Sequence, residues 1–421
     1  MLIKQYVPKF CIGFSYGLSF PLTLVILDFW LKDAGLSNAA IGMFSLFHWP
    51  FTFKFIWGVF IENYDIPYLT KRIGRNRSWI IASHLVLMIG VIGMAYSDPG
   101  SSLPKLILFA SLTALGDGCK GVVLYPYQID GTTKNQLGYL ASVVSFGHRI
   151  GMILIKVSTL HLAYFFSWKT AYLFSAFSIC LLMIAVLFME SPEENAHSPN
   201  DKSIILFLAD SFRKSLATQL KKLINRKEGL CILCVLTLYK SADFMMQKMT
   251  RLFLIEIGFS KVEIANTVQF WGSISVIIGG LISGYCIKKM GILNAMIYFG
   301  LLHAISFSSY MLLVKIGAIS WSLWFITFCE AFTGGCVTTA FLSFLYTICK
   351  TGSLYAFLWA LHDLGGMFFM GVSGALVDKI GWSSYFTLIP SAYVIILMIL
   401  RIFLCKYRPL EESCCRWMQI T

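Results

Sequence analysis

Apolar stretches of about twenty residues recur along the whole chain, and they constrain the fold more than any other feature. A transmembrane helix needs about 20 apolar residues to cross roughly 30 Å of hydrocarbon. Twelve stretches qualify: 10–31, 39–61, 78–97, 104–126, 138–162, 168–189, 229–255, 262–287, 294–314, 319–346, 354–377 and 382–405. Lipid offers no hydrogen bonds to the backbone, so such segments are helical unless they close into a barrel. The sequence predicts an all-α integral membrane protein with twelve transmembrane helices.

The composition supports a membrane protein and excludes other classes. Hydrophobic residues make up 57% of the chain and charged residues 13%, whereas soluble domains carry about 25% charge. An ordinary soluble enzyme and a disordered chain are therefore excluded. The sequence contains no H-E-x-x-H metal motif and no Walker A loop, so we expect no metal, no cofactor and no ATP-driven step.

The basic residues indicate which side of the membrane each loop occupies. The net charge of +13 would suggest nucleic acid in a soluble protein, but here Lys and Arg lie mostly between the apolar stretches. One set of loops carries twenty of them and the other set six. Because cytoplasmic loops collect Lys and Arg, we predict that both termini are cytoplasmic. We expect membrane lipid, and no nucleic acid, as a partner.

A long polar connection divides the twelve spans into two groups of six. We predict a six-helix bundle in 1–190, a cytoplasmic linker in 191–228, a second six-helix bundle in 229–405 and a cytoplasmic tail in 406–421. Within the linker, apolar residues recur every four positions from Ile204 to Ile224, which predicts an amphipathic helix. It would lie on the anionic leaflet or pack on the ends of the bundles.

Weak internal repeats support the division into halves. Ser167-Trp168 opens the sixth span and Gly381-Trp382 the twelfth, an offset of 382 − 168 = 214. The basic turns at Gly74-Arg75 and Lys288-Lys289 share this offset, since 288 − 74 = 214. Six plus six spans around a long cytoplasmic loop is the layout of a major facilitator transporter, with a site between two bundles.

Charged residues occur inside the predicted spans. A charge at the bilayer centre costs at least about 2.5 to 3.5 kcal/mol, so each needs a partner or an aqueous cavity. A simple anchor would not carry the set found here: Lys54, Lys120, Arg149, Lys156, Lys240, Asp243, Lys248, Arg251, Glu330 and Asp363.

Three basic residues are candidate ligands of an anionic substrate. Lys240 lies three residues before Asp243, hence on the same face of a helix. A buried ion pair is a poor source of stability, which favours a functional role over a purely structural one. Arg149 lies between Gly147 and Gly151, a spacing that lets another helix come close. Lys54 is the third candidate, with a structural ion pair as the alternative.

Two acidic residues are candidates for proton coupling. Glu330 is followed by Gly334-Gly335 and Thr338-Thr339, small residues that leave room for a ligand or a moving neighbour. A carboxyl group among apolar residues is a natural proton carrier, although Glu330 could instead only tie two spans together. Asp243, paired with Lys240, is the second candidate.

The histidines are scattered singly along the spans. His48, His148, His303 and His362 have no second metal-binding residue at a suitable spacing. We expect them to serve packing or to line a polar region.

Several motifs together resemble the AmpG family of muropeptide permeases, a branch of the major facilitator superfamily. They are Gly13 to Leu22, Ile41 to Leu46 with Phe53 to Trp57, Gly147 to Met152, Leu238 to Lys240 with Asp243, Glu330 to Phe341, and Gly381 to Ser383. The chain departs from the family pattern at Glu62-Asn63, at Lys120-Gly121 with Tyr125, at Gln269 and at Gly366. The chain therefore resembles a divergent member of this family, and the departures leave room for a different substrate.

The resemblance implies proton-driven import of anhydro-muropeptides through the bacterial inner membrane for peptidoglycan recycling. The equivalent positions of the two basic turns predict a role in cytoplasmic gating for Arg72, Arg75, Lys288 and Lys289, and the resemblance adds Glu62 to them. Alternatives are a transporter of another organic anion, nucleotide-like or acyl-CoA, and a polytopic membrane enzyme. The enzyme is disfavoured because no paired nucleophile and base occur.

Overall fold

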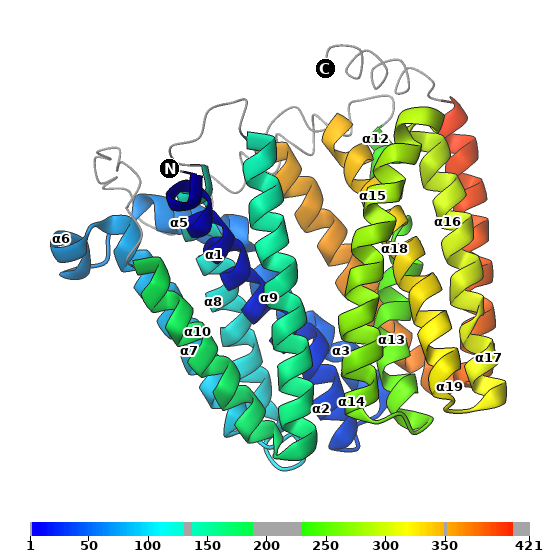
Figure 1. Cartoon of the computed structure of the whole chain (residues 1–421), viewed down its shortest axis with the longest axis horizontal. Helices are drawn as coiled ribbons and strands as arrows, with labels where there is room; N and C mark the ends of the chain where they lie inside the picture. Colours follow the sequence, from blue (N-terminus) through cyan, green and yellow to red (C-terminus); the bar gives the residue numbers. More distant parts are fainter. Residues whose placement is uncertain (1, 130–136, 188–228, 349–351, 407–421) are drawn as a thin grey trace. The chain divides into compact units, whose positions relative to one another are not determined.

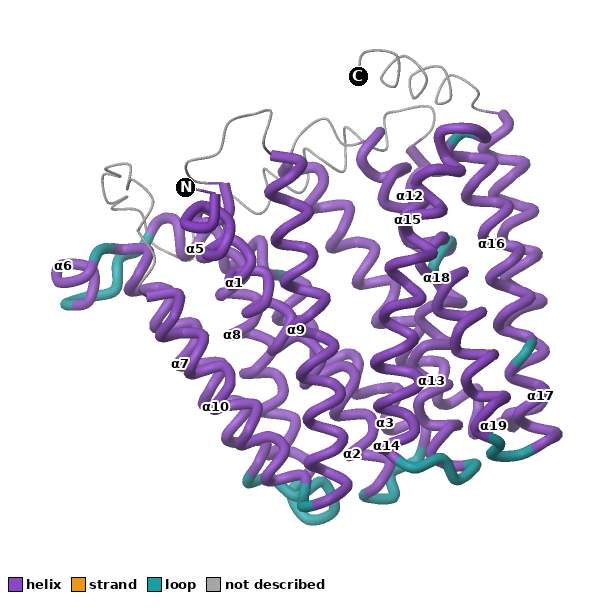
Figure 2. The backbone as a smooth tube through the Cα atoms, viewed as in Figure 1, coloured by secondary structure: helices purple, strands orange, loops and turns teal. Residues whose placement is uncertain are grey.

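The computed structural model describes residues 2–129, 137–187, 229–348 and 352–406. Every regular element in these ranges is helical (Figures 1 and 2), which confirms the predicted all-α class. The predicted linker 191–228 and the tail after Lys406 lie outside the described residues.

The chain forms two compact units, which are described separately. Unit 1 contains α1 (Leu2–Pro21), the π-helical turn η1 (Leu22–Ile26), α2 (Leu27–Asp33), α4 (Trp49–Thr52), α5 (Lys54–Asn63), α6 (Leu69–Ile73), α7 (Arg75–Ala95), α8 (Leu103–Ile129), α9 (Leu137–Phe165) and α10 (Trp168–Leu187). A core cluster of Ile12, Ile61, Ile80, Val123 and Leu124 joins α1, α5, α7 and α8.

Unit 2 contains α3 (Asn38–Phe44), α12 (Gly229–Leu238), α13 (Ser241–Glu256), α14 (Lys261–Ile264), the π-helical turn η4 (Ala265–Trp271), α15 (Gly272–Met290), α16 (Ile292–Ser308), α17 (Tyr310–Ile316), α18 (Ser320–Ile348) and α19 (Gly352–Lys406). The 3₁₀ turn η2 (Ser45–His48) connects α3 to α4. Gly381 adopts φ 75°, ψ 166° inside α19 and divides it into the predicted eleventh and twelfth spans.

Each predicted span coincides with one or more of these helices. In the described ranges, eight helices are long and apolar enough to cross a membrane, one of them comprising both spans of α19. The second predicted span is divided into several short helices within 38–63, and none of them alone is long enough to cross a membrane. The seventh is interrupted between Leu238 and Ser241, and the apolar part of the sixth is the shorter helix Trp168–Ile184.

The segment Ser37–Ser45 belongs to unit 2, although the sequence on either side of it belongs to unit 1. Its helix α3 packs along α19. At the start of α3, Asp378 accepts hydrogen bonds from the backbone N of Ala39 at 2.8 Å and from Asn38 Nδ2 at 2.9 Å. A carboxylate at a helix N-terminus is favourable because it meets free N–H groups and the positive end of the helix dipole.

A similar turn occurs once in each half of the chain and reveals an internal repeat. Asp33-Ala-Gly35-Leu-Ser37 and Glu256-Ile-Gly258-Phe-Ser260 are offset by 256 − 33 = 223. Both glycines adopt a positive φ, and both serines cap the next helix. The acidic residues accept hydrogen bonds from Trp168 Nε1 at 2.8 Å and from Trp382 Nε1 at 2.9 Å.

The repeat also locates the basic turns. Gly74 (φ 83°) precedes α7 and Gly291 (φ 81°) precedes α16, an offset of 291 − 74 = 217 rather than 214. Arg75 is consequently the first residue of α7, whereas Lys288 and Lys289 lie in the last turn of α15. The two basic turns are similar in place but not in register.

Glycines bring α1 and α9 into close contact, as the spacing of Gly147 and Gly151 predicted. A Cβ on Gly147 would overlap the carbonyl oxygen of Phe10, and one on Gly151 would overlap that of Phe14. Close backbone approach through small residues is a common way to join helices in membranes, where lipid tails compete with apolar side chains.

Candidate functional site

The seventh predicted span breaks at Lys240. Helix α12 ends at Leu238, and α13 begins at Ser241. Lys240 itself adopts φ −103°, ψ 8°, outside the helical range. Asp243 therefore falls in the first turn of α13, where a carboxylate is stabilised by the helix dipole.

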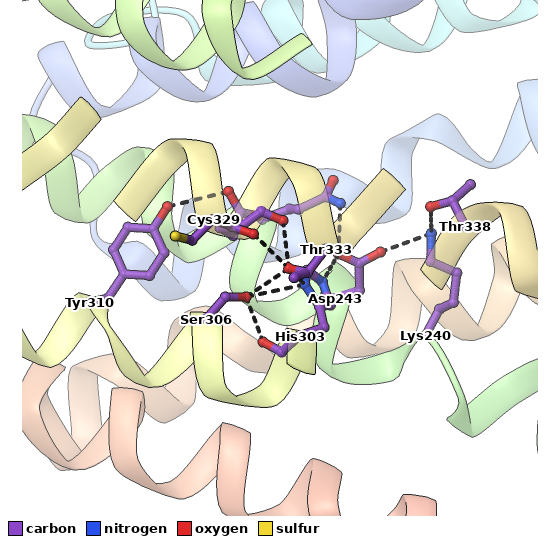
Figure 3. A network of polar contacts seen from close by, with 10 residues as sticks. Lys240, Asp243, His303, Ser306, Tyr310, Cys329, Thr333 and Thr338 are labelled. Carbon is purple, nitrogen blue, oxygen red and sulfur yellow. Dashed lines mark hydrogen bonds and ion pairs between the residues drawn. The ribbon is translucent and has the colours of Figure 1, made fainter. Parts of the chain in front are cut away.

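Lys240 and Asp243 form the predicted ion pair (Figure 3). Lys240 Nζ lies 2.8 Å from Asp243 Oδ2 and donates to Thr338 Oγ1 of α18 at 3.0 Å. The Asp243 side chain is 3% exposed and that of Lys240 is 12% exposed. Gln247 Nε2 donates to the other carboxylate oxygen, Asp243 Oδ1, at 2.8 Å. The amine is thus held by groups from two helices and keeps some access.

His303 of α16 completes this carboxylate site. Its Nε2 lies 3.3 Å from Asp243 Oδ1, and its Nδ1 lies 2.8 Å from Thr333 Oγ1 of α18. His303 thus lines a polar region, as expected of the histidines, and its partner there is a buried carboxylate. The sequence shows that a polar residue lies in the ninth span, but it does not show which residue is its partner.

Glu330 lies on α18 close to the same network. Its Oε2 accepts a hydrogen bond from the Tyr310 hydroxyl at 3.4 Å, and its backbone oxygen accepts one from Thr333 Oγ1 at 3.1 Å. Glu330 and Asp243 both belong to unit 2, and the backbone carbonyl of Glu330 is linked to Asp243 through Thr333 and His303. The structure brings these two predicted residues together with Lys240.

Unit 1 contains a second buried ion pair, which the sequence analysis missed. Lys120 Nζ lies 2.8 Å from Asp117 Oδ1 within α8, with side chains 1% and 5% exposed. Lys120 also donates to the Ser15 carbonyl at 2.8 Å and to Ser19 Oγ of α1, and Ser19 donates to Asp117. All three amine protons thus have acceptors. The three-residue spacing was the available signal, since it equals that of Lys240 and Asp243.

The two remaining candidate ligands lie in unit 1. Arg149 is half-buried in α9, between the glycines that contact α1. Lys54 is the first residue of α5, and its Nζ lies 4.8 Å from the centre of the Phe51 ring, a cation–π contact. That both face a common cavity with Lys240 remains a prediction.

The predicted gating residues lie at helix ends. Arg75 donates from Nη2 to the Ile61 carbonyl at 2.9 Å, and its Nε lies 3.6 Å from Asp65 Oδ1. It therefore ties α5 to α7 within unit 1. The other basic residues, Arg72, Lys288 and Lys289, are exposed. Glu62 falls in α5, but its side chain lies outside the described residues.

The network contains groups that can bind an anion and groups that can hold a proton. Across the residues that the structure describes, no three His, Cys, Asp or Glu side chains gather as a metal site requires. Lys240 can bind an anion, while Asp243, His303 and Glu330 can each hold a proton. These are the elements that a coupled transporter needs.

The comparisons with known proteins agree with this architecture. The Major Facilitator Superfamily profile matches residues 10–368. The Escherichia coli K12 anhydromuropeptide permease is 26% identical over 398 residues, covering 93% of this chain and 78% of that protein. The transporter AmpG 1 of Rickettsia bellii is 26% identical over 388 residues, covering 89% and 92% of the two chains.

Solved structures show the same fold. A POT family transporter in complex with a thioalcohol-conjugated peptide superposes with TM-score 0.73 at 12% identity, covering 95% of this chain and 96% of that one. A POT peptide transporter in complex with sulfate gives TM-score 0.70 at 14% identity, with 97% and 95% covered. The resemblance to AmpG is confirmed, and the chain belongs to the Major Facilitator Superfamily as a multi-pass membrane transporter rather than an enzyme.

Proposed function

We propose that this protein imports muropeptides of the anhydro type together with protons, by alternating access across a bacterial inner membrane. The observation that carries the proposal is the ion pair of Lys240 and Asp243 at a break in a membrane-spanning helix. The name of the Escherichia coli relative, anhydromuropeptide permease, supports this substrate class. Both termini are cytoplasmic in this proposal, on the basis of the Lys and Arg asymmetry.

The break in the helix supports an anionic substrate. Interrupted helices form the substrate and ion sites of many secondary transporters. Lys240 retains 12% exposure of its side chain, whereas the buried Lys120 retains 1%. Of these two amines, Lys240 is therefore the one that a cargo carboxylate can reach. A carboxylate of the peptide part of the cargo would replace Asp243 as its partner, so the positive charge stays paired throughout.

Arg149 and Lys54 serve as further carboxylate ligands in this proposal. Arg can bind a carboxylate through two parallel hydrogen bonds, while Lys acts as a point charge. Two acidic groups couple cargo transport to the proton gradient. Asp243 releases Lys240 when the cargo arrives, and Glu330 carries the driving proton. Gating at the cytoplasmic side involves Glu62, Arg72, Arg75, Lys288 and Lys289.

Uptake into proteoliposomes tests the proposal. Purified protein is reconstituted, a pH gradient is imposed, and accumulation of labelled anhydro-muropeptide is compared with that of a nucleotide and an acyl-CoA. We expect the muropeptide to accumulate only with the gradient. Accumulation of the nucleotide or acyl-CoA instead would move the protein to the transport of another organic anion.

The Glu330→Gln substitution tests the coupling role. Because the amide resembles a permanently protonated carboxyl, we expect gradient-driven accumulation to disappear while exchange of labelled for unlabelled cargo persists. Glu256→Gln is the matched control, since Glu256 is exposed and bonds Trp382. Accumulation at the wild-type rate in Glu330→Gln would instead mean that Glu330 only ties α18 to its neighbours.

A further inference from the structure

We propose that His303 takes up one proton when Lys240 leaves Asp243 to bind an anionic cargo. This inference rests on the proposed exchange of partners at Lys240. The proton on His303 balances the charge of Asp243 during the exchange, so proton uptake becomes part of cargo binding.

The position of His303 fits this role (Figure 3). The residue is fully buried at 0% exposure. Its Nε2 lies 3.3 Å from Asp243 Oδ1, on the opposite side of the carboxylate from Lys240, which approaches Oδ2. The Phe307 ring packs against the imidazole, with ring centres 4.1 Å apart. The ring is therefore held beside the carboxylate by its surroundings.

The charge balance requires a replacement for Lys240. Asp243 has three partners here: Lys240, the amide of Gln247 and His303. When the amine leaves, the amide remains neutral, and a buried carboxylate with no counter-charge is strongly destabilising. A proton on His303 converts the ring into an imidazolium that restores the pair. Release of the cargo returns Lys240 to Asp243, and the proton leaves the ring.

Thr333 lets the site accept both forms of the ring. In the neutral form, Nε2–H donates to Asp243, and Nδ1 can accept from the Thr333 hydroxyl at 2.8 Å. In the charged form, Nδ1–H donates to Thr333 Oγ1, whose proton then goes to the Cys329 carbonyl at 2.8 Å. Rotation of one hydroxyl satisfies either state, so protonation leaves no ring nitrogen unpaired.

The other ionisable groups around His303 are compatible with this assignment. Helices α13, α17, α18 and α19 carry ionisable groups near this site, which include Asp243 with Lys240 before it, Arg251, Tyr310, Glu330, His362 and Tyr393. The basic residues Lys288 and Lys289 of α15 are exposed in its last turn. Asp243 is the carboxylate that bonds the ring directly.

A histidine NMR experiment tests the inference without any cargo. The Lys240→Ala variant reproduces the loss of the amine, and ¹⁵N-labelled histidine distinguishes the neutral ring from the imidazolium. Signals are assigned with His303→Gln. At neutral pH we expect a neutral ring in the wild type and an imidazolium in Lys240→Ala. A neutral ring in Lys240→Ala, or a charged ring in the wild type, overturns the inference.

Transport supplies the second measurement. His303→Gln keeps an N–H donor for Asp243 but cannot gain a proton, so it should bind muropeptide more weakly than the wild type and take up one proton fewer on binding. His84→Gln is the control, because His84 is equally buried and bonds the Ile80 carbonyl at 2.8 Å. Proton uptake of wild-type size in His303→Gln overturns the inference. Failure of the wild type to bind muropeptide refutes the proposed cargo, while the NMR result still decides the role of His303.

Discussion

Two lysine–aspartate pairs, each three residues apart, have different surroundings and should respond differently to substitution. Lys120 and Asp117 are enclosed by Ser15 and Ser19 of α1, and both side chains are almost fully buried. Lys240 and Asp243 keep more access. Removing one partner of the first pair should therefore destabilise unit 1, while the second pair suits the exchange of partners proposed above.

Loss of the buried carboxylate should destabilise the protein strongly. Asp117→Asn leaves the Lys120 charge without its counter-charge, a change that costs about 3–5 kcal/mol in buried pairs. The matched control is Asp65→Asn, since Asp65 is 60% exposed beside Arg75 and such pairs contribute about 0–1 kcal/mol. Thermal unfolding in detergent measures both. Equal melting temperatures for the two variants would contradict the structural role of Asp117.

Cargo affinity should depend on the shape of the Arg149 side chain as well as on its charge. Arg149→Lys keeps the charge but loses one charge-assisted hydrogen bond of about 1.5 kcal/mol, which weakens binding roughly tenfold. Lys240→Ala should weaken it at least as much. Arg401→Lys, at an exposed position of α19, is the control. Binding is measured by isothermal titration with anhydro-muropeptide, and unchanged affinity in both variants would remove these residues from the site.

For the helices, an added methyl group should lower the stability where two backbones touch and raise it where a glycine borders open space. In Gly151→Ala the new Cβ would overlap the Phe14 carbonyl, and such overpacking costs about 1–3 kcal/mol. Around Gly284 of α15, a Cβ would meet nothing within 4 Å, so Gly284→Ala gains about 1 kcal/mol of helix propensity. Melting temperatures should fall in the first variant and rise slightly in the second. A rise in both would mean that α1 and α9 are not held by backbone contact.

For the whole molecule, the placement of α3 tests whether the proposed alternating access occurs by rocking of residues 1–190 against 229–405. Such rocking would assign α3 to the first body by sequence, yet α3 packs on α19 through Asp378. The contact must then open in each cycle. A short cleavable reagent that joins Ala39→Cys to Asp378→Cys should stop transport, and cleavage should restore it. The control joins Asp33→Cys to Trp168→Cys within unit 1.

Full transport after complete cross-linking of α3 to α19 would contradict that boundary. It would mean that Ser37–Ser45 moves with unit 2, and that the chain bends on both sides of this segment. Accessibility of single cysteines at Arg72 and at Lys288 then checks the cytoplasmic side. Rocking predicts that it changes in the direction opposite to accessibility at Ala39.

The sequence by itself determined the helical class and the approximate positions of the helices, and it singled out Lys240, Asp243 and Glu330 as charged residues within them. These properties are local: about twenty apolar residues must form a helix in lipid, and each charge among them needs a partner. The sequence did not determine those partners. Ser19 reaches Asp117 across 98 residues, and His303 reaches Asp243 across 60. Helices that are apolar on every side do not reveal which face meets which neighbour, so only the tertiary packing placed His303 beside the carboxylate and α3 beside α19.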